Sequence, residues 1–281
     1  MSFWTELSNT PFKIDWIDVG GIRTRYLEAG KGARTVLFLH GVAGHLDTFL
    51  RNIGPHAREY RVLAMDMIGH GYSAKPDYDY ELPHYLKHVL GFLDVMKVDT
   101  VNLLGTSLGG WVSTRIAASQ PDRVEKLVLA SSAGLTATPS VMNSIKTLST
   151  NAATTNARDA VRKRLEWVIK DPAKVDDEIL DTRYRIYTQP DYQAAIRHVM
   201  CLQEPEIRHR NLLTEEEMGR IKAPTLVIWT RDDPTADLAT GERYAAAIPG
   251  ARFEVFDQSS HLPQFEEPEK FNQMVLDFWR N

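Results

Sequence analysis

The chain has 281 residues, of which 43% are hydrophobic and 25% are charged, and its formal net charge is −4. These values predict a globular protein with one large domain, and they give no reason to expect nucleic acid as a partner. We expect neither a membrane partner nor a secretory signal, because no apolar run approaches about 18 residues and no basic start precedes an apolar stretch.

Strand patterns dominate the first part of the chain and return near its end. Two alternating segments, Lys13–Val19 and Ile22–Glu28, flank the turn at Gly20-Gly21. Short apolar runs, typical of strands in a parallel sheet, follow at Thr35–Leu39, Arg61–Met65, Val101–Leu104, Lys126–Ala130, Thr225–Trp229 and Arg252–Phe256.

Helical patterns separate these strands, at Pro83–Val95, Leu108–Ser119, Ala239–Ala247 and Pro268–Trp279. Strands that alternate with helices require crossover connections, which predict an α/β fold with a mostly parallel, eight-stranded sheet covered by helices on both faces.

The alternation stops between about Gly134 and Gly219. Helical patterns fill this stretch, at Asn156–Lys170, Val175–Thr188 and Asp191–Leu202. We interpret residues 135–218 as a helical lid over the carboxyl edge of the sheet, where open α/β sheets bind ligands. Residues 1–134 and 219–281 then form the core.

The pattern G-x-S-x-G occurs at Gly105–Gly109, between the strand VNLL and a helix. In this setting a tight turn exposes the serine hydroxyl, so the pattern predicts Ser107 as a nucleophile. An ordinary serine that caps a helix is the alternative explanation.

A serine needs a base, and the base needs an orienting acid. Asp232 and Asp233 follow the strand TLVIW, and the spacing of the turn favours Asp233. His261 follows the last strand, which completes the chain order Ser, Asp, His. We therefore predict a triad of Ser107, Asp233 and His261.

The segment from His40 to Gly44 follows the strand TVLFL. A tetrahedral intermediate needs two preorganised N–H donors, and we expect the backbone N–H groups of Val42 and Leu108 to supply them. His40 is expected to be buried and to fix this loop, although a role beside the substrate stays open.

Other features favour ordinary structural roles. The glycine-rich loop 66–73 lacks the phosphate-loop pattern and is expected to shape the sheet edge. His84 and His88 stand four residues apart, but without the glutamate of H-E-x-x-H we predict no metal site there, and no cofactor is implied. The run Arg162–Arg164 is expected on a solvated helix face. The single cysteine, Cys201, cannot form an internal disulfide, which favours a cytoplasmic location.

With these motifs in register, the whole chain resembles the α/β-hydrolase superfamily. Three stretches are similar to the meta-cleavage-product hydrolases, which cut a carbon–carbon bond in dienoates from aromatic ring fission. These stretches are Pro121–Leu135, Asp176–Gln193 and His261–Arg280.

The resemblance implies roles for three further residues. A lid arginine of that family binds the dienoate carboxylate or the region of the reacting ketone, and Arg183 falls at the matching place. Without the resemblance, Arg183 would be interpreted as a surface arginine. Thr106 stands where the family usually has asparagine, and Leu262 where it usually has tryptophan, so both are expected to contact the acid end of the substrate.

The sequence therefore predicts a serine hydrolase that cleaves a C–C bond beside a ketone. A carboxylesterase or lactonase with the same triad is the main alternative, and a ligand receptor without turnover is a third. The expected partner is a small-molecule substrate, and a homo-oligomer, such as a dimer, stays open.

Overall fold

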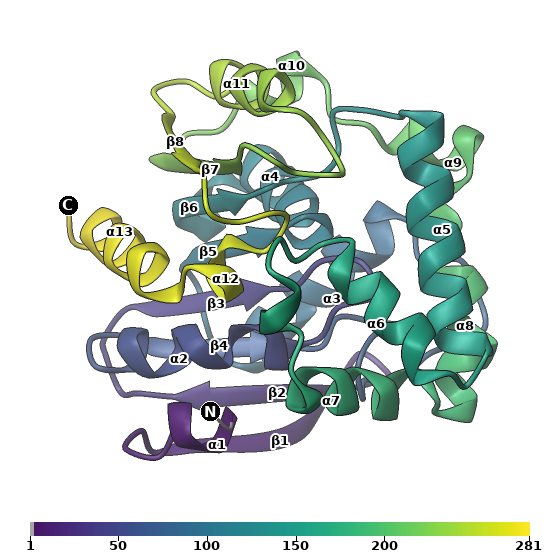
Figure 1. The fold of residues 1–281 in the computed structure, drawn as a ribbon. Coiled ribbons are helices and arrows are strands. Elements are labelled where there is room, and N and C mark those ends of the chain that lie inside the picture. The colour runs from purple at the N-terminus through teal and green to yellow at the C-terminus, as the bar shows by residue number, and fades with distance from the viewer. Residues whose placement is uncertain (1–2) are drawn as a thin grey trace.

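The computed structural model describes residues 3–281 and is built around one eight-stranded sheet (Figure 1). The strand order is β1-β2-β4-β3-β5-β6-β7-β8. Strand β2 pairs antiparallel with both β1 and β4, whereas the other five neighbouring pairs are parallel. The predicted mostly parallel sheet of eight strands is thus confirmed. The strands are β1 (Phe12–Val19), β2 (Ile22–Ala29), β3 (Thr35–Leu39), β4 (Arg61–Met65), β5 (Val101–Thr106), β6 (Val124–Ala130), β7 (Thr225–Thr230) and β8 (Arg252–Phe256).

Burial follows the position of each strand in the sheet. Every residue of β3, β5 and β7 is buried, because these strands have neighbours on both sides and helices on both faces. Strand β8 is only partly buried, since it forms an edge of the sheet. The apolar runs in the sequence therefore mark the strands that form the core.

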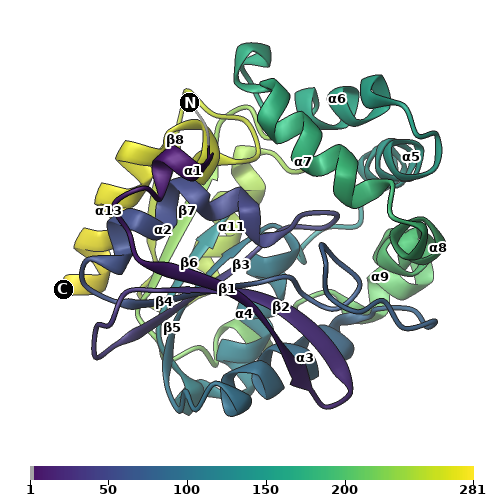
Figure 2. The same cartoon turned by 90° about the horizontal axis from the view of Figure 1, so that it is seen from below.

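Helices cover both faces of the sheet. Figure 2 shows α2 and α13 together on one face, with α3 and α4 on the other. The helix α2 was not predicted as a separate element, because Gly54 and Pro55 interrupt its helical pattern. The helical segments of the core are α1 (Phe3–Glu6), η1 (Leu46–Phe49), α2 (Leu50–Ala57), α3 (Leu82–Val95), α4 (Leu108–Ser119), η2 (Pro121–Arg123), α11 (Leu238–Ala246), α12 (Pro263–Glu266) and α13 (Pro268–Arg280).

Helical segments are inserted between β6 and β7, and the parallel strands point toward them (Figure 1). We call this insertion the lid after its expected role. Helix α6 is shorter than the predicted helix Asn156–Lys170. No bounds were predicted for α5, because its many polar residues obscure the helical periodicity of its apolar residues. The short α10 packs on α4 of the core. The segments are α5 (Pro139–Thr154), α6 (Arg158–Glu166), η3 (Pro172–Lys174), α7 (Asp177–Tyr187), α8 (Pro190–Val199), η4 (Cys201–Gln203), α9 (Pro205–Asn211) and α10 (Glu215–Met218).

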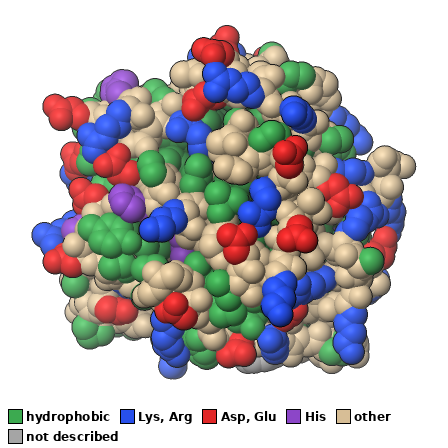
Figure 3. Space-filling model, turned by 180° about the vertical axis from the view of Figure 1, so that it is seen from behind, with side chains coloured by type: hydrophobic (Ala, Val, Ile, Leu, Met, Phe, Trp, Pro, Cys, Tyr) green, Lys and Arg blue, Asp and Glu red, His purple; other side chains and the backbone are tan. Residues whose placement is uncertain are grey.

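The surface opposite to the view of Figure 1 carries side chains of both charges, interspersed over the whole face (Figure 3). This mixture agrees with the modest formal net charge of −4. Within residues 3–281, no helix is long and apolar enough to cross a membrane.

Candidate active site

Ser107 lies in the sharp turn between β5 and α4. Its backbone has φ 54° and ψ −112°, a strained conformation for a residue with a β-carbon. The flanking glycines permit this turn, because a β-carbon on Gly105 would lie 2.3 Å from the carbonyl of Gly109, and one on Gly109 would lie 2.1 Å from that of Leu39. Backbone hydrogen bonds of Ser107 also hold the turn. The Ser107 carbonyl accepts from Trp111 N at 3.0 Å, and the Ser107 N–H donates to Ala130 O at 3.1 Å.

Asp233 and His261 are in contact, as the loops after β7 and β8 bring them together. His261 Nδ1 lies 2.9 Å from Asp233 Oδ2, and the carboxylate also accepts from the Thr235 N–H at 2.8 Å and the Thr235 hydroxyl at 2.7 Å. Burial alone would raise the pKa of Asp233, but His261 and Thr235 hold it below its ordinary value. Asp233 is therefore placed to orient the imidazole as a charged acceptor.

Asp232, the rival carboxylate, points elsewhere. Its side chain is 55% exposed and pairs with Lys170 Nζ at 2.7 Å. The side chain of Asp233, by contrast, is fully buried. The structure thus brings Asp233 to the histidine and leaves Asp232 in a surface ion pair with the base of the lid.

Ser107 and His261 line the same cavity, together with His40, Val42 and Leu262. Across residues 3–281 no hydrogen bond joins the serine hydroxyl to the imidazole. Such contacts often tighten only when substrate binds. The arrangement can support acyl transfer, with the serine as nucleophile and the histidine as base.

The expected oxyanion donors also border Ser107. Val42 and Leu108 line one cavity with it, and Gly41 approaches so closely that an added β-carbon would lie 3.1 Å from Ser107 Cβ. Leu108 is the first residue of α4, so its N–H has no partner within the helix. Neither N–H donates to another group among the described residues, so the oxyanion role of Val42 and Leu108 stays a prediction that the geometry permits.

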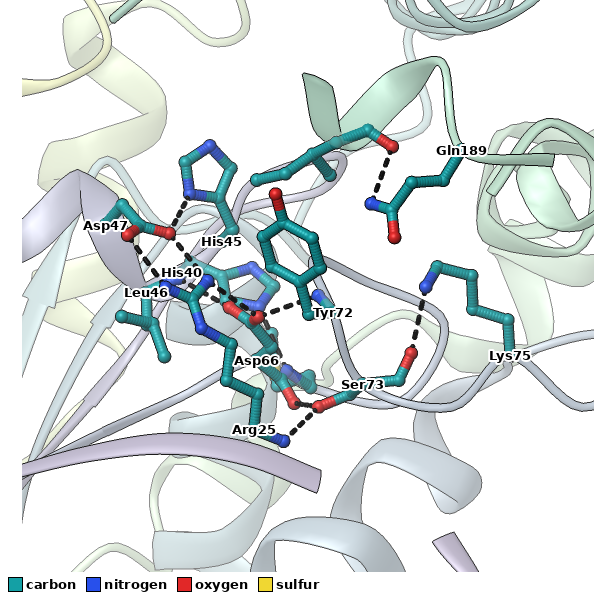
Figure 4. Close-up of polar contacts among 12 residues, drawn as sticks. Arg25, His40, His45, Leu46, Asp47, Asp66, Tyr72, Ser73, Lys75 and Gln189 are labelled. Carbon is teal, nitrogen blue, oxygen red and sulfur yellow. Dashed lines mark hydrogen bonds and ion pairs between the residues drawn. The ribbon is translucent and has the colours of Figure 1, made fainter. Parts of the chain in front are cut away.

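A buried ion cluster fixes the loop that carries Val42 (Figure 4). Both terminal nitrogens of Arg25 donate to Asp47, at 2.8 and 2.9 Å, and one lies 3.3 Å from Asp66. Asp66 also accepts from Leu46 N at 2.7 Å, and His45 Nδ1 lies 2.8 Å from Asp47. Burial opposes ionisation, but His45 and Arg25 hold the pKa of Asp47 well below its ordinary value. Asp66 thus ties the glycine-rich loop 66–73 to the loop 40–47 that carries Val42, which we call the oxyanion loop after its expected role.

His40 is buried at the start of the same loop. Its Nε2 accepts from Met67 N at 3.0 Å, and its Nδ1 lies 2.8 Å from the carbonyl of Gly41. Burial lowers the pKa of His40 to about 3, so the ring is neutral. With both nitrogens occupied, His40 is placed to hold the loop, although its ring borders the cavity.

Two cavities meet at Ser107 and Val42, which line both. The arginine-side cavity is lined by Arg164, Leu165, Val168, Arg183, His261 and Leu262. The tryptophan-side cavity is lined by Trp111, Leu135, Val141, Ile145, Leu202 and Arg208. A substrate whose reacting carbonyl lies at Ser107 can therefore place a polar end in one cavity and an apolar end in the other.

Arg183 is buried in the lid helix α7 and is not a surface arginine. Its Nη1 donates to the Ala43 carbonyl at 2.7 Å and lies 3.2 Å from the Tyr187 hydroxyl, which also donates to Ala43 at 2.6 Å. The Nε of Arg183 is buried and has no partner among the described residues. Arg183 thus both braces the oxyanion loop and offers a free donor beside the cavity.

Three expectations need comment. Leu262 lines the arginine-side cavity, whereas Thr106 lines neither cavity and its hydroxyl is buried. The solvated face expected for Arg162–Arg164 is wrong for Arg164, which is 8% exposed and borders the arginine-side cavity.

Arg208 was not identified from the sequence at all, because nothing in the sequence shows that α9 turns this side chain inward. No group of three or more metal-ligating side chains occurs in the described part of the chain.

Comparisons with known proteins agree with this geometry. The family model described as "alpha/beta hydrolase fold" matches residues 34–268. A 2-hydroxy-6-oxononadienedioate/2-hydroxy-6-oxononatrienedioate hydrolase of Paraburkholderia phymatum is 32% identical over 92% of this chain and 91% of its own. A 2-hydroxy-6-oxo-6-phenylhexa-2,4-dienoate hydrolase of Comamonas testosteroni is 30% identical over 100% of this chain and 99% of its own.

A solved structure gives the same result. The crystal structure of a meta-cleavage product hydrolase superposes with a TM-score of 0.84, at 25% identity over 95% of this chain and 97% of the other. The sequence-based prediction of the family is confirmed. The chain is a serine hydrolase of the α/β-hydrolase family and belongs, within that family, with the meta-cleavage-product hydrolases.

Proposed function

We propose that the chain hydrolyses the C–C bond beside the 6-oxo group of a 2-hydroxy-6-oxo-2,4-dienoate. The observation that carries this proposal is Arg183, a buried guanidinium beside the cavity that contains Ser107 and His261. A guanidinium with free N–H groups suits a carboxylate, which it binds through parallel charge-assisted hydrogen bonds. A simple neutral ester has no such group.

The two cavities suggest how such a substrate lies. Its carboxylate binds toward Arg183, and its 6-oxo carbon lies at Ser107 with the oxygen toward the N–H groups of Val42 and Leu108. The substituent on the ketone then occupies the tryptophan-side cavity, whose lining includes Leu135 and Ile145. This orientation places the charged end of the substrate beside an arginine and its apolar substituent beside apolar side chains.

The reaction uses the triad for acyl transfer. The dienol first ketonises: its 2-hydroxyl loses a proton and C5 gains one, so that the resulting 2-oxo group is an electron acceptor conjugated through C3 and C4 toward C5. His261 removes the proton from Ser107, whose oxygen attacks C6. The C5–C6 bond then breaks, its electron pair is delocalised through C4 and C3 onto the C2 oxygen, the proton that left Ser107 ends on that oxygen, and the acyl group remains on Ser107. Water releases the acyl group, so the products are a carboxylic acid and 2-hydroxypenta-2,4-dienoate.

The relatives support this choice, since those from Paraburkholderia phymatum and Comamonas testosteroni are both named as hydrolases of 2-hydroxy-6-oxo acids. A cytoplasmic location belongs to the same proposal. A carboxylesterase or lactonase would use the same triad, because the fold hosts many reactions.

A side-by-side rate comparison tests the proposal. The purified chain is assayed with 2-hydroxy-6-oxo-6-phenylhexa-2,4-dienoate and with 4-nitrophenyl esters of several chain lengths. We expect kcat/KM for the dienoate to exceed that for every ester by about 10²-fold or more, since the esters lack the carboxylate. Faster turnover of an ester would identify an esterase, and no turnover with either substrate would favour a receptor.

A further inference from the structure

Arg164 is a second buried arginine of the arginine-side cavity. It lies on α6, and its guanidinium stands 5.3 Å from the centroid of the Trp167 ring. Its Nε donates to Ser149 Oγ at 3.1 Å. Across residues 3–281, neither terminal nitrogen of Arg164 has a hydrogen-bond partner, and no carboxylate pairs with this guanidinium. Four N–H bonds are thus unused in a side chain that lines the same cavity as Ser107.

Arg183 leaves donors unused in the same cavity. Its Nη1 is bound to Ala43, but its Nε and Nη2 have no partner among the described residues. The charge of Arg183 acts on Arg164, since burial and that charge lower the pKa of Arg164, while Tyr187 and Tyr192 raise it. Arginine remains charged nonetheless. Two buried cations therefore face one cavity without a resident acid.

The neighbouring groups do not neutralise this charge. Burial lowers the pKa values of His40 and His45, so both rings are neutral and add no charge. Asp47 is engaged by Arg25 and His45. Two desolvated cations carry a large cost unless anionic groups pair with them. A single carboxylate would neutralise one charge and leave the second.

We propose that Arg164 and Arg183 together bind a head group that carries two adjacent anionic groups, as oxalate does. A carboxylate binds at Arg183, and the second anionic group binds at Arg164. This inference deepens the proposed function and rests on it for the natural ligand. In a 2-hydroxy-dienoate, the oxygen on C2 stands next to the carboxylate, and its ionised form supplies the second charge. Arg164 is then a specificity-determining residue for 2-oxygenated acids.

Protection of Ser107 tests the site without the natural substrate. The full-length chain is labelled with a fluorophosphonate at constant ionic strength and pH 7.5, in the presence of oxalate or acetate. In the unmodified chain we expect oxalate to halve the labelling rate at a concentration at least about tenfold below that of acetate. Equal concentrations for the two anions would overturn the proposal, whatever the variants show.

Variants then assign the effect to Arg164. Arg164→Met should raise the oxalate concentration for half-protection about tenfold, and that of acetate less than about threefold, because one of two anion contacts is lost. Lys163→Met is the matched control, since it removes a charge from an exposed neighbour on the same helix. It should change neither value. Equal oxalate effects of Arg164→Met and Lys163→Met would contradict the assignment.

Two further results separate this inference from the function that it extends. Arg164→Lys keeps the charge without the planar fork and should restore part of the oxalate preference, which gives a second test if the methionine variant is unstable. An oxalate preference that depends on Arg164, in a chain that does not cleave the dienoate, would retain the anion site and reject the C–C hydrolase. Dienoate cleavage in a chain whose oxalate preference does not depend on Arg164 would retain the C–C hydrolase and reject the anion site.

Discussion

The two cavities that meet at Ser107 are both lined by buried arginines, but Arg208 of the tryptophan-side cavity and Arg164 of the arginine-side cavity are held differently. In the tryptophan-side cavity, Arg208 Nε donates to the Thr136 carbonyl at 2.7 Å, and its Nη1 donates to that of Leu202 at 3.3 Å. Its guanidinium also stands 5.2 Å from the centroid of the Trp111 ring. Burial lowers the pKa of Arg208 to about 10, yet backbone carbonyls and an aromatic face stabilise the cation.

In the arginine-side cavity, Arg164 has one hydrogen bond, to Ser149, and both of its terminal nitrogens are free among the described residues. The same residue type is thus a packing element on one side of the nucleophile and an unpaired cation on the other. Burial alone does not distinguish a binding arginine from a structural one. The difference is whether the N–H donors of the guanidinium are already hydrogen-bonded within the protein.

The largest expected effect concerns the group that both cavities share. Ser107→Ala should lower kcat by about 10⁴-fold or more for a dienoate and for a 4-nitrophenyl ester alike, because no other group can form the acyl-enzyme. The fold should persist, which circular dichroism checks. Activity within tenfold of the unmodified chain on either substrate would contradict the nucleophile assignment.

Asp233→Asn should cost about 10⁴-fold in kcat on both substrates, because the amide permits the wrong histidine tautomer. Asp232→Asn is the matched control one residue away. It breaks a half-exposed ion pair with Lys170, and we expect less than about a threefold change. A reversal of the two effects in steady-state assays would identify Asp232 as the acid.

Arg183→Ala should separate the two sides of the nucleophile. For the dienoate we expect kcat/KM to fall about 10²-fold, since a buried charged pair loses one partner. The ester should lose about fivefold, which corresponds to about 1 kcal/mol for the hydrogen bond to Ala43.

Tyr187→Phe is the control for that hydrogen bond, because the Tyr187 hydroxyl donates to the same carbonyl at 2.6 Å and carries no charge. It should cost about fivefold on both substrates. If Arg183→Ala and Tyr187→Phe give the same loss on the dienoate, Arg183 supports the loop and does not bind a carboxylate.

Acidification should lower kcat/KM on both substrates by about tenfold per pH unit, because only neutral imidazole accepts the serine proton. Hydrogen bonds from His261 and Thr235 hold the pKa of Asp233 below its ordinary value despite burial, so the carboxylate stays ionised over this range and its pairing would be lost only at lower pH. His40, with a pKa of about 3, does not titrate in this range either. A profile that is flat from pH 5 to 8, or one with a slope of two, would contradict a single histidine base.

The smallest effect on activity should come from Arg208→Met. We expect kcat/KM for the dienoate to change less than about threefold, while the free energy of unfolding in urea falls by about 1–3 kcal/mol, because two backbone carbonyls lose their donor. A loss of dienoate affinity without a loss of stability would show that the substituent reaches Arg208.

The sequence was most informative where local structure places a functional residue. The glycines around Ser107 and the loops after the last two strands identify the three triad candidates, since turn chemistry and chain order set their positions. Arg183 came from family resemblance, because helical periodicity alone suggested a surface position. Thr106 shows the limit of that resemblance, since it lines neither cavity.

The lid was predicted as helical, but the inward face of each lid helix was not. Arg164 stands in a run of three charged residues, and only the packing of α6 against α5 and α7 shows which of the three is buried. The burial of Arg208 depends in the same way on α9. Tertiary contacts therefore determine which polar side chains face the proposed substrate cavity, whereas local sequence identifies the residues expected to cleave the substrate.

A crystal structure of Ser107→Ala with 2-hydroxy-6-oxo-6-phenylhexa-2,4-dienoate tests the division of the site most directly. We expect the carboxylate within hydrogen-bonding distance of Arg183, the C2 oxygen beside Arg164, and the phenyl group in the tryptophan-side cavity near Ile145. The 6-oxo carbon should lie over the β-carbon of residue 107. A carboxylate bound toward Arg208, with the phenyl group against Arg183, would contradict the account.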